Sequence, residues 1–215
     1  RDHLLSIRRQ RQMCIRDSYK SVQELVGHTP LLELTHIEKE YNLQAKILVK
    51  LEYFNPAGSV KDRIAKQMIE EAETTGTIKP GSVIVEPTSG NTGIGLSMIA
   101  QTKGYKSIIV MPESMSIERR KLMKAYGSEL VLTPAKDGMK GAIAKAKEIV
   151  ESTPNAWTPG QFTNQANVHA HYNTTGPEIW QDTDGNVDML IAGVGTGGTI
   201  TAVSYTHLRA HETDS

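Results

Sequence analysis

Three strand–helix units that follow one another between residues 83 and 152 constrain the fold of this chain more than any other feature. Each unit is a short apolar run followed by a segment with helical periodicity, and the last helix keeps one apolar face. Strands that alternate with helices are typical of a parallel sheet covered by helices on both sides. The sequence therefore predicts an α/β fold, with strands at 83–85, 107–111 and 129–133 and helices that end at about 103, cover 117–126 and cover 138–152.

The segments on either side of these units predict a second lobe. Apolar runs at 31–34 and 45–51 predict two strands within an N-terminal segment, 19–54, and the smaller α/β lobe then occupies 55–152. A break after residue 152 and a further apolar run at 189–194 predict that a larger lobe begins at 153 and contains a buried strand. We therefore expect a two-lobed arrangement whose larger lobe is represented only by residues 153–202.

Both ends of the chain have sequences that look foreign to the rest. Residues 13–17 can be encoded by a DNA string whose reverse complement encodes residues 203–207, and chance explains this poorly. The string resembles a transposase adapter used in DNA library preparation. We therefore expect residues 1–18 and 203–215 to be adapter-derived and outside the fold, with 1–18 disordered and the natural reading frame continuing past 202.

The composition excludes several classes of function. The formal net charge is zero, with 24 basic and 24 acidic residues, so nothing predicts binding to nucleic acid or to an anionic membrane. No apolar run is as long as a membrane span, and the histidines show no metal-ligand spacing. The only cysteine, Cys14, lies in the foreign N-terminal part. The remaining chain has no disulfide framework, which suits a cytoplasmic protein.

One lysine stands at a junction where lysines are disfavoured. A turn rich in Pro and Gly at 55–58 is followed by Ser59, a good helix cap, so Lys61 falls in the first turn of the next helix. The positive end of the helix dipole disfavours a charged amine there and lowers its pKa. A lysine with a lowered pKa is suited to act as a nucleophile or a base. The apolar positions of this helix are Ile64, Met68, Ile69 and Ala72.

A loop at 88–92 follows the first strand of the sheet and is rich in hydrogen-bond donors. It combines three hydroxyls and one amide with the backbone N–H groups that a helix N-terminus leaves unpaired. Gly90 and Gly93 would let a ligand approach the backbone. A substrate carboxylate is the expected guest, and an ordinary capped turn is the alternative interpretation.

A second loop, at 193–199, has glycines at four of its seven positions and precedes a helix. This composition suits a phosphate cradle made of backbone N–H groups. Gly193, Gly195 and Gly198 also satisfy the dinucleotide-binding pattern G-x-G-x-x-G, which keeps a nicotinamide-dependent dehydrogenase open as an alternative. Together, a reactive lysine, a carboxylate loop and a phosphate cradle fit an aldehyde cofactor that bears a phosphate and processes an amino acid.

Several motifs carry a resemblance to a known family. The strings NPAGSVKDR, EPTSGNTGIGL, MPESMSIERR, TTGPEIW and GVGTGGTIT together resemble the cysteine synthases, the O-acetylserine sulfhydrylases of the fold-type II pyridoxal-phosphate enzymes. The resemblance covers residues 19–202 and implies the three-layer, parallel-sheet fold of the tryptophan synthase β-subunit kind. It also implies that the family continues for about another third of its length, including a serine that contacts the pyridine nitrogen.

The resemblance also implies roles for individual residues. Lys61 would carry pyridoxal 5'-phosphate as a Schiff base and later move a proton, and Asn91 would bind the cofactor's ring hydroxyl oxygen. The phosphate would be held by Gly195, Thr196, Gly197, Gly198 and Thr199. The substrate carboxylate would be held by Thr88, Ser89, Gly90, Thr92 and Gln161. No metal is implied.

The expected reaction is a β-replacement that converts O-acetyl-L-serine and sulfide to L-cysteine and acetate. Cystathionine β-synthase and serine/threonine dehydratase are the alternatives within the same fold type. The resemblance further implies a homodimer and, for some members, serine acetyltransferase as a partner. Because the larger lobe is incomplete, we expect the 215-residue chain to be inactive by itself.

Overall fold

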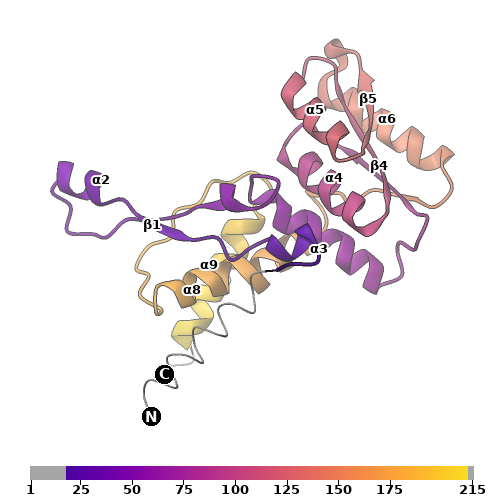
Figure 1. Cartoon of the computed structure of the whole chain (residues 1–215). Helices are drawn as coiled ribbons and strands as arrows, with labels where there is room; N and C mark the ends of the chain where they lie inside the picture. Colours follow the sequence, from indigo (N-terminus) through magenta and orange to yellow (C-terminus); the bar gives the residue numbers. More distant parts are fainter. Residues whose placement is uncertain (1–17, 213–215) are drawn as a thin grey trace.

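The computed structural model describes residues 18–212 and contains a four-stranded sheet (Figure 1). The strand order is β5-β4-β3-β6, and every neighbouring pair is parallel. Each strand after β3 is reached through a crossover, as the alternation of strands and helices predicts. The bounds are Val83–Pro87 for β3, Lys106–Pro112 for β4, Glu129–Thr133 for β5 and Ala156–Trp157 for β6.

Helices cover both faces of this sheet, which confirms the predicted three layers. Val83, Val85 and Val110 point to one face and pack against α6 (Gly138–Ser152). Ile84 and Ile109, which alternate with them, point to the opposite face. That face is covered by α3 (Lys61–Thr74), α4 (Asn91–Lys103) and α5 (Ile117–Ala125).

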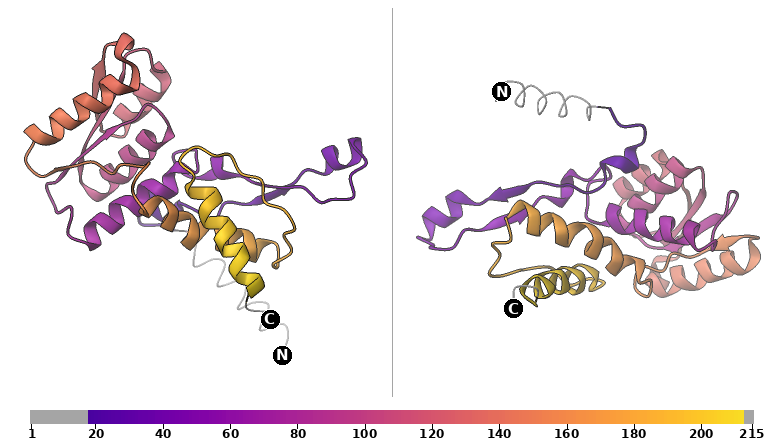
Figure 2. Two further views of the ribbon diagram at one scale, coloured as in Figure 1. Left: turned by 180° about the vertical axis from the view of Figure 1, so that it is seen from behind. Right: turned by 90° about the horizontal axis from the view of Figure 1, so that it is seen from below.

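The rest of the described chain lies beside the sheet. An antiparallel pair, β1 (Leu31–Glu33) and β2 (Leu48–Lys50), with α2 (Thr35–Glu40) between its strands, projects as an arm (Figure 2). A helical group packs below α3, and its members lie side by side in both views (Figure 2). The group consists of α7 (Ala166–Ala170), the π-helical turn η4 (His171–Thr175), α8 (Gly176–Asp182) and α9 (Gly198–Glu212). Short 3-10 turns are η1 (Val22–Leu25), η2 (Glu52–Phe54) and η3 (Ala135–Asp137).

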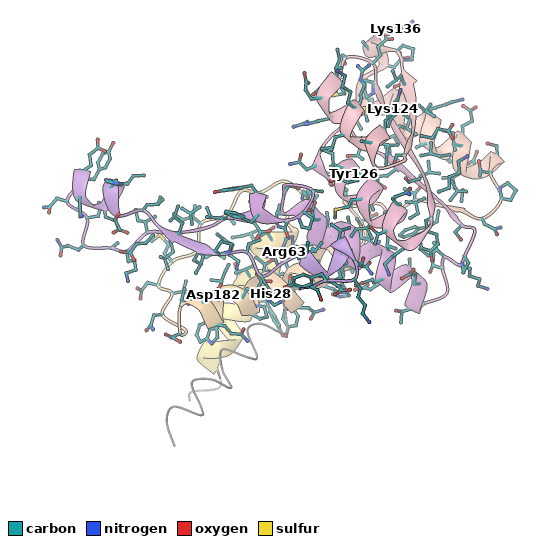
Figure 3. The ribbon with its side chains drawn as sticks, viewed as in Figure 1. His28, Arg63, Lys124, Tyr126, Lys136 and Asp182 are labelled. Atoms are coloured by element: carbon teal, nitrogen blue, oxygen red, sulfur yellow. The ribbon has the colours of Figure 1, made fainter. Side chains whose placement is uncertain are left out.

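A buried cluster of charges fastens the arm, α3 and α8 together. Arg63 donates two hydrogen bonds to each of two carboxylates: Glu178 at 2.6 and 2.7 Å, and Glu52 at 2.8 Å twice. Lys50 of β2 adds an ion pair with Glu178 at 2.9 Å. Arg63 and its neighbours His28 and Asp182 lie where these three elements meet (Figure 3).

The sheet continues past the predicted lobe break at residue 152, because β6 pairs with β3 through Ala156 and Trp157. The division into lobes stays a prediction. The predicted buried strand at 189–194 is wrong: these residues form no strand, and Met189 and Ile191 are 77% and 88% exposed. Neither sheet of the described residues includes this run, so its backbone is paired with no strand of either sheet.

The predicted end of the fold at 202 also needs correction. Helix α9 continues to Glu212, and the side chain of Val203 is 4% exposed. Residues 203–212 are therefore helical, while their adapter origin stays a prediction about the DNA. The predictions for 1–17 and 213–215, including Cys14, lie outside the described residues. Within 18–212, no helix is long and apolar enough to cross a membrane.

Candidate active site

Lys61 is the first residue of α3, directly after a tight turn. Gly58 has a φ of 84°, which a residue with a side chain rarely adopts, and the turn brings the chain into the helix. The cap residue of α3 is Val60 and not the predicted Ser59, but Ser59 Oγ accepts a hydrogen bond from the Lys61 backbone N–H at 3.2 Å. The Lys61 side chain is half-buried, and this burial lowers the pKa of its amine. The amine is therefore more easily neutral than a solvated lysine.

The loop before Lys61 is held by its sequence neighbour Asp62. The Asp62 side chain is completely buried, and its Oδ2 accepts a hydrogen bond from the Ala57 backbone N–H at 2.6 Å. Burial raises the pKa of Asp62 to about 7, although the Ala57 bond acts against it. Asp62 thereby fixes the loop that presents Lys61.

The donor-rich loop at 88–92 lies next to the start of α3. No side chain caps α4, whose cap residue is Gly90, so its first backbone N–H groups have no partner within the helix. A Cβ on Gly95, one turn into α4, would lie 3.2 Å from the Lys61 carbonyl oxygen. The glycine therefore lets α4 approach the residue that carries the candidate nucleophile.

Gly93 does not have the predicted role. A Cβ at this position would lie 2.9 Å from both Met123 and Thr88, so the absence of a side chain serves the packing of α4. Gly90 does have open space where a Cβ would lie, as a ligand-facing position requires. Asn91, the first residue of α4, has an exposed side chain.

Gln161 comes from a distant part of the chain and meets this loop. The Thr92 hydroxyl donates a hydrogen bond to Gln161 Oε1 at 2.6 Å. The segment around Gln161 is held by Glu86 of β3, which accepts a hydrogen bond from the Gly160 backbone N–H at 3.0 Å. Burial raises the pKa of Glu86 to about 7, against the effect of hydrogen bonds from Gly160 and Gln161.

The glycine-rich loop at 193–199 precedes α9 and fits a phosphate. Gly193 and Gly195 have open space where a Cβ would lie, and Gly197 has a φ of 83°. The loop leads directly into the N-terminus of α9, whose first N–H groups favour an anion. The Thr196 hydroxyl accepts a hydrogen bond from Asn167 at 2.8 Å.

A buried histidine supports the same loop from below. His171 is 0% exposed, with Nδ1 2.9 Å from the Thr175 hydroxyl and Nε2 3.2 Å from the Thr199 hydroxyl. Burial, together with the positive charges of Arg63 and Lys61, lowers the pKa of His171 to about 4. The ring is therefore neutral at neutral pH, and its two nitrogens connect η4 and α9 through hydrogen bonds.

The structure thus links the two predicted loops, through Gln161, by residues that the sequence did not single out for the site. Glu86 and Asn167 hold the segment of Gln161, and Asn167 and His171 hold the glycine-rich loop. No motif marks these supporting residues, because each is recognised only through partners far along the chain. Within the described residues, no group of three or more His, Cys, Asp or Glu side chains is placed to hold a metal ion.

Comparisons with known proteins identify relatives of this chain. A cysteine synthase of a Flavobacterium species is 55% identical over 186 residues, and cysteine synthase A of Escherichia coli K12 is 57% identical over 180 residues. These alignments cover 86% and 83% of this chain but only 60% and 54% of the relatives. The chain therefore spans little more than half the length of the curated relatives it matches.

A solved structure of similar fold is the cysteine synthase of Entamoeba histolytica. It has a TM-score of 0.86 and 43% sequence identity, and the match covers 91% of this chain and 58% of that one. Residues 22–214 match the family described as pyridoxal-phosphate dependent enzyme. This match favours the pyridoxal phosphate interpretation of the glycine-rich loop over the nicotinamide alternative. The chain belongs to the family of pyridoxal-phosphate dependent enzymes.

Proposed function

We propose that the protein is a cysteine synthase that converts O-acetyl-L-serine and sulfide to L-cysteine and acetate. The observation that carries the proposal is the identity of 55% and 57% to cysteine synthases over more than four fifths of the chain. In this reaction the bond between the β-carbon and the acetate oxygen breaks, and a bond between the β-carbon and sulfur forms.

The residues of the chain have separable tasks in this proposal. Lys61, whose pKa is lowered by burial, holds the cofactor aldehyde and moves the proton at the substrate α-carbon. Pyridoxal phosphate, when bound, supplies an electron-withdrawing ring that stabilises negative charge at that carbon. The glycine-rich loop, Gly195 to Thr199, holds the phosphate, and Asn91 holds the ring hydroxyl oxygen.

The substrate carboxylate is assigned to the loop of Thr88, Ser89, Gly90 and Thr92, with Gln161. The Thr92 hydroxyl proton is already directed at Gln161 Oε1, so Thr92 contributes its backbone N–H to the carboxylate. The same bond leaves the Gln161 side-chain NH₂ group to donate to the substrate. The homodimer, the serine acetyltransferase partner, the cytoplasmic location and the inactivity of the 215-residue chain by itself stay predictions.

The decisive test is chemical trapping at Lys61. Reduction with borohydride in the presence of pyridoxal phosphate should attach the pyridoxyl group to Lys61, detected by mass spectrometry of the peptide that contains it. Lys61→Ala should abolish the labelling, because Lys61 is the lysine whose backbone lies against α4, the helix that follows the carboxylate loop. Lys66→Ala, which removes a half-buried lysine of the same helix, is the matched control and should label normally.

Product analysis then distinguishes the enzymes of this fold type, and it uses the protein with the missing part of its larger lobe restored, because the 215-residue chain is expected to be inactive by itself. Cysteine formed from O-acetylserine and sulfide supports the proposal, and cystathionine formed preferentially from homocysteine would replace it. Equal labelling of the reference chain and Lys61→Ala would show that Lys61 is not the cofactor lysine.

A further inference from the structure

Asn167 of α7 joins the two loops to which the substrate carboxylate and the cofactor phosphate are assigned. Its side chain is 3% exposed. The Asn167 Nδ2 donates one hydrogen bond to the Gln161 backbone carbonyl at 2.8 Å and another to the Thr196 hydroxyl at 2.8 Å. One buried amide group therefore contacts both sides of the candidate site.

The beginning of α9 is shaped around the same side chain. A Cβ on Gly198 would lie 2.8 Å from Asn167 Cγ, which is closer than real side chains approach one another. Asn167 cannot swing away without breaking its two hydrogen bonds. Asn167 Oδ1 is buried and has no hydrogen-bond partner among the described residues. A buried acceptor without a donor lowers the stability of the fold. The benefit of Asn167 at this position must therefore come from its NH₂ group.

The two bonds direct donors toward the ligands. Because the Thr196 hydroxyl oxygen accepts from Asn167, its own proton is left to donate, and the neighbouring anion is the assigned phosphate. The second bond fixes the Gln161 backbone, and Gln161 Oε1 already accepts from Thr92. The Gln161 NH₂ group is therefore oriented away from Thr92.

We propose that Asn167 is a positioning residue that sets the spacing between the phosphate loop and the carboxylate loop. This inference rests on the proposed function. It predicts that one side chain, which touches neither ligand, affects the affinity for both. Thr196, by contrast, should affect only the affinity for the phosphate.

The test compares two cofactor probes that differ only in the phosphate. The dissociation constant of pyridoxal phosphate should rise about tenfold in Asn167→Ala. This is the effect expected when the Thr196 hydroxyl is no longer oriented to donate a hydrogen bond to the charged phosphate. The dissociation constant of pyridoxal, which lacks the phosphate, should stay within about twofold of the reference. Asn173→Ala, an exposed asparagine two residues beyond His171, is the matched control and should change neither value.

The coupling is measured with L-serine, which carries the carboxylate but no acetyl leaving group. Its dissociation constant from the pyridoxal phosphate-loaded protein, followed by visible absorption, should rise in Asn167→Ala but not in Thr196→Val. If Asn167→Ala does not fold, Asn167→Leu serves instead, because leucine is of similar size, lacks the NH₂ donors and adds no charge beside the assigned phosphate.

The outcomes separate this inference from the proposed function. Equal weakening of pyridoxal and pyridoxal phosphate would indicate a general structural role and overturn the inference. Unchanged affinity for pyridoxal phosphate, with normal labelling of Lys61, would overturn it as well and leave the proposed function standing. Failure of the reference protein, with the missing part of its larger lobe restored, to bind pyridoxal phosphate at all would overturn both.

Discussion

At the scale of single residues, buried carboxyl groups hold the loops of the candidate site. Asp62 binds the Ala57 N–H and Glu86 binds the Gly160 N–H. Both are almost completely buried, and burial raises the pKa of each to about 7. A carboxyl group in such a place is protonated over much of the range in which it would be ionised in water. The protonation states of Asp62 and Glu86 are therefore linked to the positions of the loops that contain Ala57 and Gly160.

Glu86→Gln should change how stability depends on pH. The Glu86 pKa is about 7 in the folded chain and 4.5 as its ordinary value. The folded state therefore holds a proton that the unfolded state has lost, and stability falls as pH rises from about 4.5 to 7. Glutamine does not titrate, so the variant should gain about 1–3 kcal/mol relative to the reference across this range.

Urea unfolding at several pH values measures this difference. Glu129→Gln, in which a half-exposed carboxylate paired with Lys106 is replaced, is the control and should show no such trend. A constant difference between Glu86→Gln and the reference from pH 4.5 to 7 would show that Glu86 is ionised throughout.

At the scale of elements, the candidate site depends on the close contact of α3 and α4. Gly95 makes this contact possible, because a Cβ there would lie 3.1 Å from Ala65 Cβ and 3.3 Å from Asp62 Cα. These neighbours belong to the first turns of α3, so any displacement would move the helix that carries Lys61. The geometry between the lysine and the carboxylate loop is thus set by a residue with no side chain.

Gly95→Leu should therefore force α3 and α4 apart. Overpacking of this kind costs about 1–3 kcal/mol of unfolding free energy. Gly195→Leu provides the control for stability, since that position has open space and no unusual backbone angle. Thermal unfolding compares the two variants with the reference. An equal melting temperature for Gly95→Leu and the reference would show that a larger side chain fits between α3 and α4, and would contradict the prediction.

The elements also show where prediction from the sequence succeeds and why it stops. The predicted bounds of β5 and α6 equal the observed ones, because both elements have strong local periodicity. The run at 189–194 is also apolar, but it belongs to neither sheet of the described residues, because strand pairing is not a local property.

The same reasoning applies to the candidate site. Lys61 and the two loops stand out through local composition. Asn167 is recognised only by its contact with Thr196, 29 residues away in the sequence, and Glu86 by its contact with Gly160, 74 residues away. Polar residues of this kind have no local signal, and only the tertiary arrangement reveals them.

At the scale of the whole molecule, the Arg63 cluster connects α3 and the segment after β2 to α8 of the helical group. Burial alone would raise the pKa of Glu178, but hydrogen bonds from Arg63 and Lys50 lower it to about 2. The carboxylate is therefore ionised at neutral pH. Arg63 lies two residues after Lys61, so the cluster also anchors the start of α3.

Glu178→Gln should destabilise the chain by about 2–4 kcal/mol, because it leaves Arg63 and Lys50 buried with one charged partner fewer. Asp182→Asn is the matched control: it removes another Lys50 partner on α8, but one whose side chain is 46% exposed, and should cost less than about 1 kcal/mol. The stabilisation by Glu178 is present above its ordinary pKa of 4.5 and is lost as pH falls towards 2. Denaturant unfolding should therefore show the same defect at pH 6 and pH 8 and a smaller one below about pH 4.

A double-mutant cycle separates the ion pair from the burial of its members. Arg63→Met leaves Glu178 paired only with Lys50, and Glu178→Met leaves Arg63 paired with Glu52. Each single variant therefore leaves buried charges with fewer partners of opposite sign. The double variant removes both charges and fills the space with apolar atoms, and its loss should be smaller than the sum of the single losses by about 1–3 kcal/mol. Simple additivity would mean that Arg63 and Glu178 act independently, and that the arm, α3 and α8 are held by their apolar contacts instead.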